Sequence, residues 1–261
     1  MRLAVPVLAV VMWLGLAASA SAHPASGLPG LFPDLRAAVP GQFTVQNDHQ
    51  REYLRFSNLI GNTGEGALRL RPEHDPVTNV TTGYQEVFDM LGGTVLDEPV
   101  SEFIFHPAHN HWHITAVALF EIRTALDQGT TGRYGSVVGG QTIKTTFCLI
   151  DVVRLEGNSN TPNRTYWDCF PDQHQGISAG WGDQYHQATE GQELQLTGQP
   201  PGVYYLVTTS NPDGAFYESN YTNNTAWASF RLRRDSKGNA KVDPVGHSDC
   251  AGTLCGAGPN R

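Results

Sequence analysis

Four histidines lie within eight residues, in the segment F-H-P-A-H-N-H-W-H that ends at His113. Three of them, His109, His111 and His113, are two residues apart, so on an extended strand their side chains point to the same side. Three neutral imidazoles on one face can bind Cu(II), Zn(II), Ni(II) or Fe(II), among which copper binds most tightly. We predict that these three residues are metal ligands, and their spacing alone leaves the metal open.

His106 breaks this two-residue spacing, and Pro107 bends the chain directly after it. We therefore place His106 outside the ligand set, as a residue that supports the ligands or as a loop histidine. The alternative for the whole cluster is a solvated histidine-rich turn, or a surface that binds metal only adventitiously.

A second group of candidate ligands lies in the last quarter of the chain. Glu218, Asn220, Asn223 and Asn224 fall within seven residues and carry carboxylate and amide oxygens. Hard oxygen ligands in one tight turn are of the kind that calcium accepts. The pattern predicts a second, structural metal site there, and an Asn-rich β-turn without an ion is the alternative.

The segments that must position these residues have the pattern of strands. Short apolar stretches rich in Val, Ile, Thr, Tyr and Phe are separated by clusters of Gly, Pro, Asn and Asp, and long runs of helical period are scarce. This pattern predicts an all-β fold, a β-sandwich-like single domain with long loops and little helix. The expected strands are 42–46, 53–58, 67–70, 103–105, 111–122, 142–151, 193–196, 203–210 and 225–232.

The start of the chain has the pattern of a signal peptide, residues 1–22. Arg2 precedes an apolar stretch, and Ala20-Ser21-Ala22 follows it as a cleavage site. The apolar stretch is shorter than the ~20 residues that a membrane-spanning helix needs, so we expect a secreted, extracellular protein with no membrane anchor in its mature form. Residues 23–235 are expected to form the single domain, and residues 236–261 a loosely ordered C-terminal tail.

Charge and cysteine content limit the partners and the compartment. The formal net charge of −8 at pH 7 disfavours nucleic acid as a partner and mildly attracts cationic amines. The four cysteines suit an oxidising compartment and permit three pairings, of which we favour Cys148 with Cys169 and Cys250 with Cys255.

Several segments, in the same order along the chain, resemble motifs of the lysyl oxidase family. The histidine segment resembles the family's copper-binding pattern H-x-x-H-x-H-x-H. Lys144 begins K-T-T-F-C-L-I-D, which is similar to K-x-x-F-C-L-x-D, and Tyr185 ends Q-G-I-S-A-G-W-G-D-Q-Y, which is similar to Q-G-[IL]-S-x-G-x-x-D-x-Y. P-G-V-Y-Y-L and E-S-N-Y-T-N-N, which start at Pro201 and Glu218, resemble P-G-x-Y-x-L and E-S-D-Y-T-N-N. The matches spread over about half of the chain.

This resemblance implies a copper amine oxidase of the protein-lysine 6-oxidase type, with copper on His109, His111 and His113. It also implies that Lys144 and Tyr185 join to form a self-derived lysine tyrosylquinone cofactor. The implied activity is oxidative deamination of primary amines to aldehydes by dioxygen, with release of hydrogen peroxide and ammonia. The substrates would be lysine side chains of an extracellular protein or small amines.

The sequence departs from the family pattern at two cysteines. Pro107 or Ala108 occupies the position of one near the histidines, and no cysteine lies between Cys148 and Cys169. Cys148 and Cys169 are then free to pair with each other, which would hold the Lys144 neighbourhood near the segment that ends at Tyr185.

The resemblance also extends the predicted calcium site. In related enzymes the E-S-D-Y-T-N-N turn works with an early Asp-Leu pair, for which Asp34 and Leu35 are the counterparts here. Asn220 stands where the family has an aspartate, which lowers the negative charge of the site.

An amine oxidase needs a base that removes a proton from the carbon bearing the amine. We assign this role to Asp183, two residues before Tyr185, with His174 and Asp151 as the alternatives. For each of these residues alone, the competing role is structural, such as capping a turn.

Two other functions compete with the amine oxidase. A signal peptide cut after Ala22 would leave His23 as an amino terminus that chelates copper, as in a copper monooxygenase, but this role leaves Lys144 and Tyr185 without a purpose. The other is a non-catalytic, secreted copper-binding or adhesion module.

Overall fold

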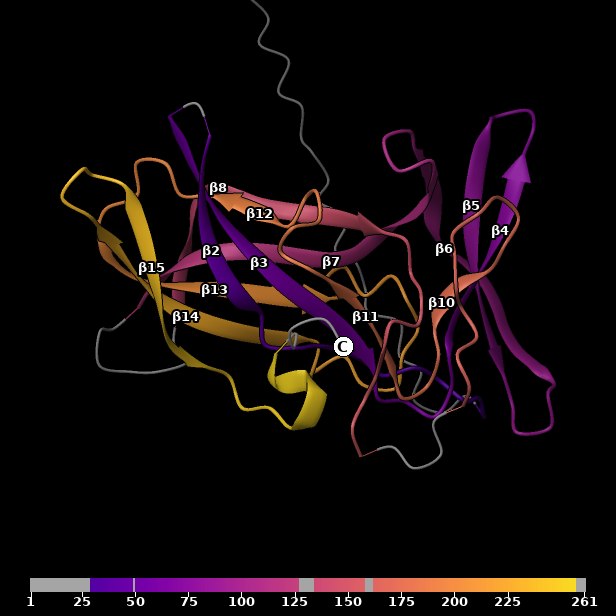
Figure 1. Cartoon of the computed structure of the whole chain (residues 1–261). Coiled ribbons are helices and arrows are strands. Elements are labelled where there is room, and N and C mark those ends of the chain that lie inside the picture. The colour runs from indigo at the N-terminus through magenta and orange to yellow at the C-terminus, as the bar shows by residue number, and fades with distance from the viewer. Residues whose placement is uncertain (1–28, 49, 127–133, 158–161, 257–261) are drawn as a thin grey trace, which may run out of the picture.

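The computed structural model of the chain describes residues 29–48, 50–126, 134–157 and 162–256, with the side chains of these residues except 139–145. This part of the chain is built almost entirely of strands, which form two antiparallel sheets (Figure 1). Its helical element is one short 3₁₀ helix, Gly252–Cys255. The prediction of an all-β single domain with little helix is confirmed.

The smaller sheet has six strands and is centred on the long strand β3 (Arg51–Asn62). Its strand order is β1-β3-β11-β9, and β2 and β12 also pair with β3. The bounds of these strands are β1 Leu35–Ala37, β2 Gly41–Asp48, β9 Val153–Arg154, β11 Trp181–Tyr185 and β12 Glu193–Gln195.

The larger sheet has nine strands in the order β10-β4-β5-β6-β7-β13-β14-β15, and β8 also pairs with β7. In Figure 1, β4, β5 and β6 form a wing on the right of the molecule, away from β14 and β15. The bounds are β4 Leu68–Asp75, β5 Val80–Phe88, β6 Thr94–His106, β7 His111–Ala125, β8 Tyr134–Phe147, β10 Gln175–Ile177, β13 Gly202–Ser210, β14 Thr225–Arg234 and β15 Ala240–His247.

The main hydrophobic core joins the two sheets. Phe56 of β3 packs edge-on against Phe120 of β7 at 4.9 Å between ring centroids, and Phe120 contacts Phe147 of β8 at 6.4 Å. All three rings are buried, and burial of each stabilises the fold by roughly 1.5–3 kcal/mol. Because Phe147 lies between Thr146 and Cys148, the core fixes the end of β8 that borders the histidine cluster.

The prediction of a loosely ordered tail over residues 236–261 was wrong for much of that segment. Ala240–His247 forms β15, which pairs with β14 along seven residue positions. Ala240 is buried in the main core, and Val242 packs against it. The charged residues and Pro244 of this strand suit its place at the edge of the sheet.

The predicted signal peptide, residues 1–22, and His23 lie outside the described residues. In the part of the chain that the structure covers, no helix has the length and apolar character needed to cross a membrane.

Candidate functional site

A β-hairpin carries the histidine cluster. In the register of β6 and β7, His106 lies opposite His111 and Ile104 lies opposite His113. His109 belongs to the turn between the strands, where its N–H donates to the carbonyl of His106 at 3.1 Å. The three predicted ligands were expected on one extended strand, but only His111 and His113 are in β7. The turn brings His109 to the other two.

The ligand nitrogens of the three histidines converge. One ring nitrogen from each of His109, His111 and His113 lies within 4.8 Å of the other two. Nε2 of His113 is 3.0 Å from Nε2 of His111 and 3.5 Å from Nδ1 of His109. Two imidazole nitrogens that are each about 2 Å from a common ion lie roughly 3–4 Å apart. The cluster therefore fits a bound transition metal.

The surroundings of His111 and His113 lower the pKa values of both imidazoles. Burial, followed by the neighbouring charges of His111, His106 and His109, lowers the pKa of His113 to about 4. Burial first, and then His109 and His106, also lower the pKa of His111. A neutral imidazole has a free lone pair, so both residues are in the protonation state that binds a metal at neutral pH.

His106 packs against the cluster without joining it. Its ring stacks on His109 at 4.2 Å and on His113 at 4.8 Å between centroids. Its Nδ1 is buried and has no hydrogen-bond partner among the described residues. Whether His106 supports the ligands or is only a loop histidine stays a prediction.

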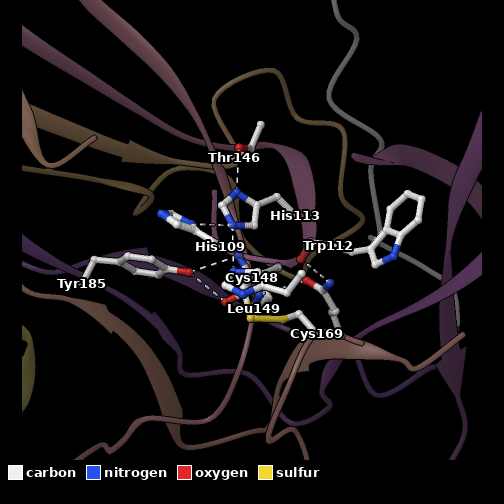
Figure 2. The surroundings of a disulfide bond; sticks show 10 residues. His109, Trp112, His113, Thr146, Cys148, Leu149, Cys169 and Tyr185 are labelled. Atoms are coloured by element: carbon white, nitrogen blue, oxygen red, sulfur yellow. Dashed lines mark hydrogen bonds between the residues drawn. A yellow bond between two sulfur atoms is a disulfide. The ribbon is translucent and has the colours of Figure 1, made fainter. Parts of the chain in front are cut away.

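Tyr185 lies beside the histidines, on β11 of the other sheet. Its hydroxyl donates to the carbonyl of Cys148 at 2.9 Å and accepts from the N–H of Cys148 at 3.0 Å (Figure 2). Its ring meets Phe147 edge-on at 4.5 Å between centroids. Burial, and then the charge of Asp183, raise the pKa of Tyr185 well above its ordinary value.

A disulfide joins Cys148 to Cys169, as predicted, and a second joins Cys250 to Cys255. The first bond lies next to Tyr185 and the histidines, whereas the indole of Trp112 points away from them (Figure 2). The N–H of Trp112 donates to the carbonyl of Cys169 at 2.9 Å, so the disulfide loop is also tied to β7.

One cavity of about 260 Å³ connects the histidine cluster with Tyr185. The hairpin, the end of β8, Tyr185 and the loop before β12 form its wall. The lining residues are His106, His109, His113, Thr146, Phe147, Tyr185, Thr189, Glu190, Gly191 and Gln192. Gln192 is buried, and its Oε1 has no hydrogen-bond partner among the described residues.

The model of the family described as lysyl oxidase matches residues 94–240, which is more than half of the chain and contains the histidines, Lys144 and Tyr185. The chain belongs to the lysyl oxidase family. It is 30% identical over 156 residues to lysyl oxidase homolog 2 of Bos taurus and 30% identical over 174 residues to lysyl oxidase homolog 3A of Danio rerio. These matches cover 56% and 67% of this chain, and 18% of each relative, so the chain spans less than a fifth of their length.

The resemblance to the lysyl oxidase family predicts that Lys144 is the partner of Tyr185 in the quinone cofactor. The backbone of Lys144 lies in β8 opposite Leu119 of β7, two residues before Thr146, which lines the cavity. Its side chain is outside the described part of the structure, so the join between Lys144 and Tyr185 stays a prediction.

Two residues that sequence reasoning missed contact the ligands. The hydroxyl of Thr146 is 3.1 Å from Nδ1 of His113, and a carboxylate oxygen of Glu190 is 3.3 Å from Nε2 of His109. Both lie within a few residues of a lysyl oxidase motif, Thr146 inside the one that starts at Lys144 and Glu190 after the one that ends at Tyr185. That position is the signal that could have indicated them.

The three candidates for the base have different surroundings. Asp183 is buried in β11, and its Oδ2 has no hydrogen-bond partner among the described residues. Burial, and then the charge of Asp151, raise its pKa well above the ordinary value. Asp151 accepts hydrogen bonds from Thr165, Tyr166 and Ser178, which is the pattern of a structural carboxylate.

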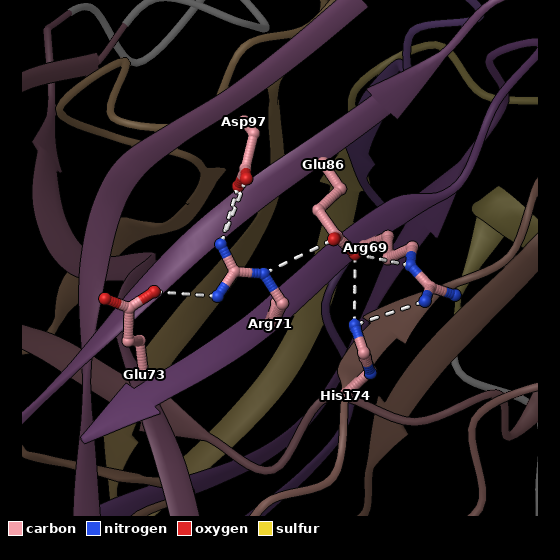
Figure 3. Close-up of polar contacts among 6 residues, drawn as sticks. All are labelled: Arg69, Arg71, Glu73, Glu86, Asp97 and His174. Atoms are coloured by element: carbon pink, nitrogen blue, oxygen red, sulfur yellow. Dashed lines mark hydrogen bonds and ion pairs between the residues drawn. The ribbon is translucent and has the colours of Figure 1, made fainter. Parts of the chain in front are cut away.

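His174 belongs to an ion-pair network on the wing (Figure 3). Its Nε2 is 3.0 Å from Glu86 and 3.2 Å from Arg69, and it does not line the cavity at the histidine cluster. Burial, and then Arg69, lower the pKa of His174. Arg71 continues the network to Glu86, Glu73 and Asp97, so the network links β4, β5 and β6, and His174 contacts its members on β4 and β5.

The predicted calcium residues lie where the start of the described chain meets the segment before β14. The buried Glu218 accepts the N–H of Leu35 at 2.8 Å and the side-chain amides of Asn211 and Asn224 at 2.6 Å each. Burial raises the pKa of Glu218 to about 7. The carboxylate of Asp34 accepts the side-chain amide of Asn223 at 2.9 Å.

Two residues of the predicted calcium site have free oxygens that fit a bound cation. Two other residues of the predicted ligand set are engaged in hydrogen bonds instead. Oδ1 of Asn223 and Oδ1 of Asn224 are buried without a hydrogen-bond partner among the described residues, so both are available as hard ligands. Asn220 instead accepts from the hydroxyl and N–H of Thr222, within its own turn. The carbonyl of Leu35 accepts the hydroxyl of Ser210 at 3.2 Å.

Proposed function

We propose that this chain is a copper- and quinone-dependent amine oxidase, which converts primary amines to aldehydes with release of hydrogen peroxide and ammonia. The observation that carries the proposal is the cavity that has both the histidine cluster and Tyr185 in its wall. Membership of the lysyl oxidase family supports it.

In this proposal His109, His111 and His113 hold copper, since their nitrogens converge and the pKa values of His111 and His113 are lowered. When bound, copper and the quinone derived from Lys144 and Tyr185 supply the oxidising centre that dioxygen regenerates. The protein holds the Tyr185 ring in place through Phe147 and the backbone of Cys148. This anchoring fixes the orientation of the ring toward the cavity.

Asp183 is the proposed base. Its raised pKa means that, once ionised, its carboxylate is a stronger base than an ordinary aspartate. It does not line the cavity, but it lies on the same face of β11 as Tyr185 because the two residues are two positions apart. This position next to Tyr185 is the basis for proposing it as the base.

The substrates in this proposal are cationic primary amines, either small amines or lysine side chains of a secreted protein. The net charge of −8 favours cations. Secretion is supported by the two disulfides, because disulfides persist in oxidising compartments. We also propose a structural calcium ion held by Asp34, Glu218, Asn223 and Asn224.

The test is amine-dependent release of hydrogen peroxide by protein loaded with Cu(II) in air. We expect release from a panel of primary amines for wild type, and none for His111→Ala, Tyr185→Phe or Lys144→Ala. Lys241→Ala, an exposed lysine in β15, is the matched control and should keep full activity. Binding of one copper ion per chain without peroxide release from any amine would instead indicate a copper-binding module.

A further inference from the structure

His109 differs from the other two predicted ligands in how it is held. His111 and His113 are fixed by the backbone pairing of β7, whereas His109 lies in the turn before it. Asn110, the next residue, has a positive φ of 54°, which asparagine adopts more readily than most residues. The orientation of the His109 ring therefore depends on side-chain contacts.

The two ring nitrogens of His109 have different neighbours. Nδ1 faces Nε2 of His113 at 3.5 Å, inside the cluster. Nε2 faces the carboxylate of Glu190 at 3.3 Å, on the outside of the cluster. A neutral imidazole has one N–H and one lone pair, and a carboxylate can only accept a hydrogen bond. A carboxylate this close to Nε2 favours the tautomer with the proton on Nε2, which leaves the lone pair of Nδ1 directed at the other ligands.

We propose that Glu190 is a positioning residue, which fixes the tautomer and the ring orientation of His109 so that Nδ1 binds the metal. This inference rests on the proposed copper site. Metal-binding histidines commonly donate their second N–H to a carboxylate in this way, which also makes the ligand nitrogen more basic.

The loop that carries Glu190 is well anchored. The N–H of Thr189 donates to the carbonyl of His186 at 2.8 Å, and the N–H of Gln192 donates to the carbonyl of Thr189 at 3.2 Å. The carbonyl of Gln192 accepts the N–H of Phe56, a core residue of β3. The backbone on both sides of Glu190 is thus tied to the smaller sheet, and it can hold the carboxylate at His109.

His113 has a similar but less specific contact. The hydroxyl of Thr146 is 3.1 Å from its Nδ1, which leaves Nε2 for the cluster. A hydroxyl can donate or accept, so Thr146 orients the ring without deciding which nitrogen carries the proton. Of these two side chains, Glu190 and Thr146, only Glu190 imposes a tautomer.

The competing role for Glu190 is a substrate contact. Its side chain is 71% exposed and lines the cavity, so it could attract the ammonium group of an amine without affecting the metal. The two roles predict different results. A positioning carboxylate affects copper affinity, and an amide oxygen can replace it in part because it also accepts a hydrogen bond. A substrate contact through charge affects KM, and glutamine is then no better than alanine.

The experiment measures the Cu(II) dissociation constant by competition with a chelator, and the copper EPR spectrum, for wild type, Glu190→Ala and Glu190→Gln. Glu98→Gln, an exposed glutamate of β6, is the matched control for loss of one negative charge. We expect Glu190→Ala to bind copper about 10–100-fold more weakly with an altered spectrum, and Glu190→Gln to be intermediate. Glu98→Gln should match wild type.

Two results would overturn this inference in different ways. Wild-type affinity and spectrum in Glu190→Ala would exclude the positioning role, and a raised KM in the same variant would then make Glu190 a substrate contact. If copper binding by the wild-type protein does not depend on His111, the proposed function itself fails. Thermal unfolding of each variant checks that the exposed substitution leaves the fold intact.

Discussion

At the scale of single residues, the chemistry of the site depends on which side chains have partners. The spacing of the three histidines indicated a cluster, but alternate residues of a strand explain only His111 and His113, and the turn brings in His109. The contacts of Glu190 and Thr146 could not be predicted, because these residues meet the histidines only after β8 and the loop before β12 have packed around the hairpin. Their position in or near a family motif could have indicated these two residues, but not the contacts that they make with the histidines.

Asp183 gives a prediction for one residue, because its carboxyl is buried and its pKa is raised. An acid whose folded pKa lies above its unfolded value destabilises the fold as pH rises above the unfolded value, and this loss grows until the folded pKa is reached. Asparagine has no such loss. We therefore expect Asp183→Asn to be at least as stable as wild type at pH 7 in urea unfolding.

The same substitution removes the proposed base. Turnover with a primary amine should fall by about 10²–10⁴-fold while copper binding stays unchanged. Asp172→Asn, an exposed aspartate in the loop after Cys169, serves as the control. Normal turnover by Asp183→Asn would show that another group takes the proton.

At the scale of elements, all nine expected strands were found, but β11 was missed although it carries Tyr185. Its sequence W-G-D-Q-Y has no alternation of apolar residues, and its place is set by pairing with β3 and β9. In β5 every second residue is buried, but two of these buried residues are the polar Thr81 and Gln85. The position of β11 and the burial of polar residues in β5 both depend on contacts with strands that are distant in the sequence.

The Cys148–Cys169 disulfide links β8 to the loop that precedes β10 and β11. The two cysteines are 21 residues apart, so the chain-entropy model gives a stabilisation of about 3 kcal/mol. We expect the double variant Cys148→Ser/Cys169→Ser to lose about that much free energy of unfolding in urea. Tyr185 should also lose order, because both of its hydroxyl contacts are to the Cys148 backbone.

The second disulfide is the matched control for this change. Cys250 and Cys255 are only 5 residues apart and lie far along the chain from the cavity residues, so their removal should cost about 2 kcal/mol. It should leave quinone formation intact. A larger loss from this second pair than from the first would contradict the assigned role of Cys148–Cys169.

At the scale of the whole molecule, two distant parts of the chain are tied together at Glu218, through the N–H of Leu35 and the amide of Asn224. The larger sheet then brings the histidine hairpin to the side of β8 and β13, and β3 brings Tyr185 against Phe147 from the other sheet. The cavity exists because these two sheets meet there. Sequence motifs indicated its members, but only the packing of the sheets gives the shape and size of the space between them.

The central claim is that copper and a quinone from Lys144 and Tyr185 share this cavity. The most direct test is to load the protein with Cu(II) in air, treat it with phenylhydrazine and map the adduct by mass spectrometry. We predict an adduct on a cross-linked peptide that contains both Lys144 and Tyr185, absent from Lys144→Ala and from Tyr185→Phe. A wild-type protein that binds one copper ion per chain, but has neither cross-link nor adduct, would contradict the claim.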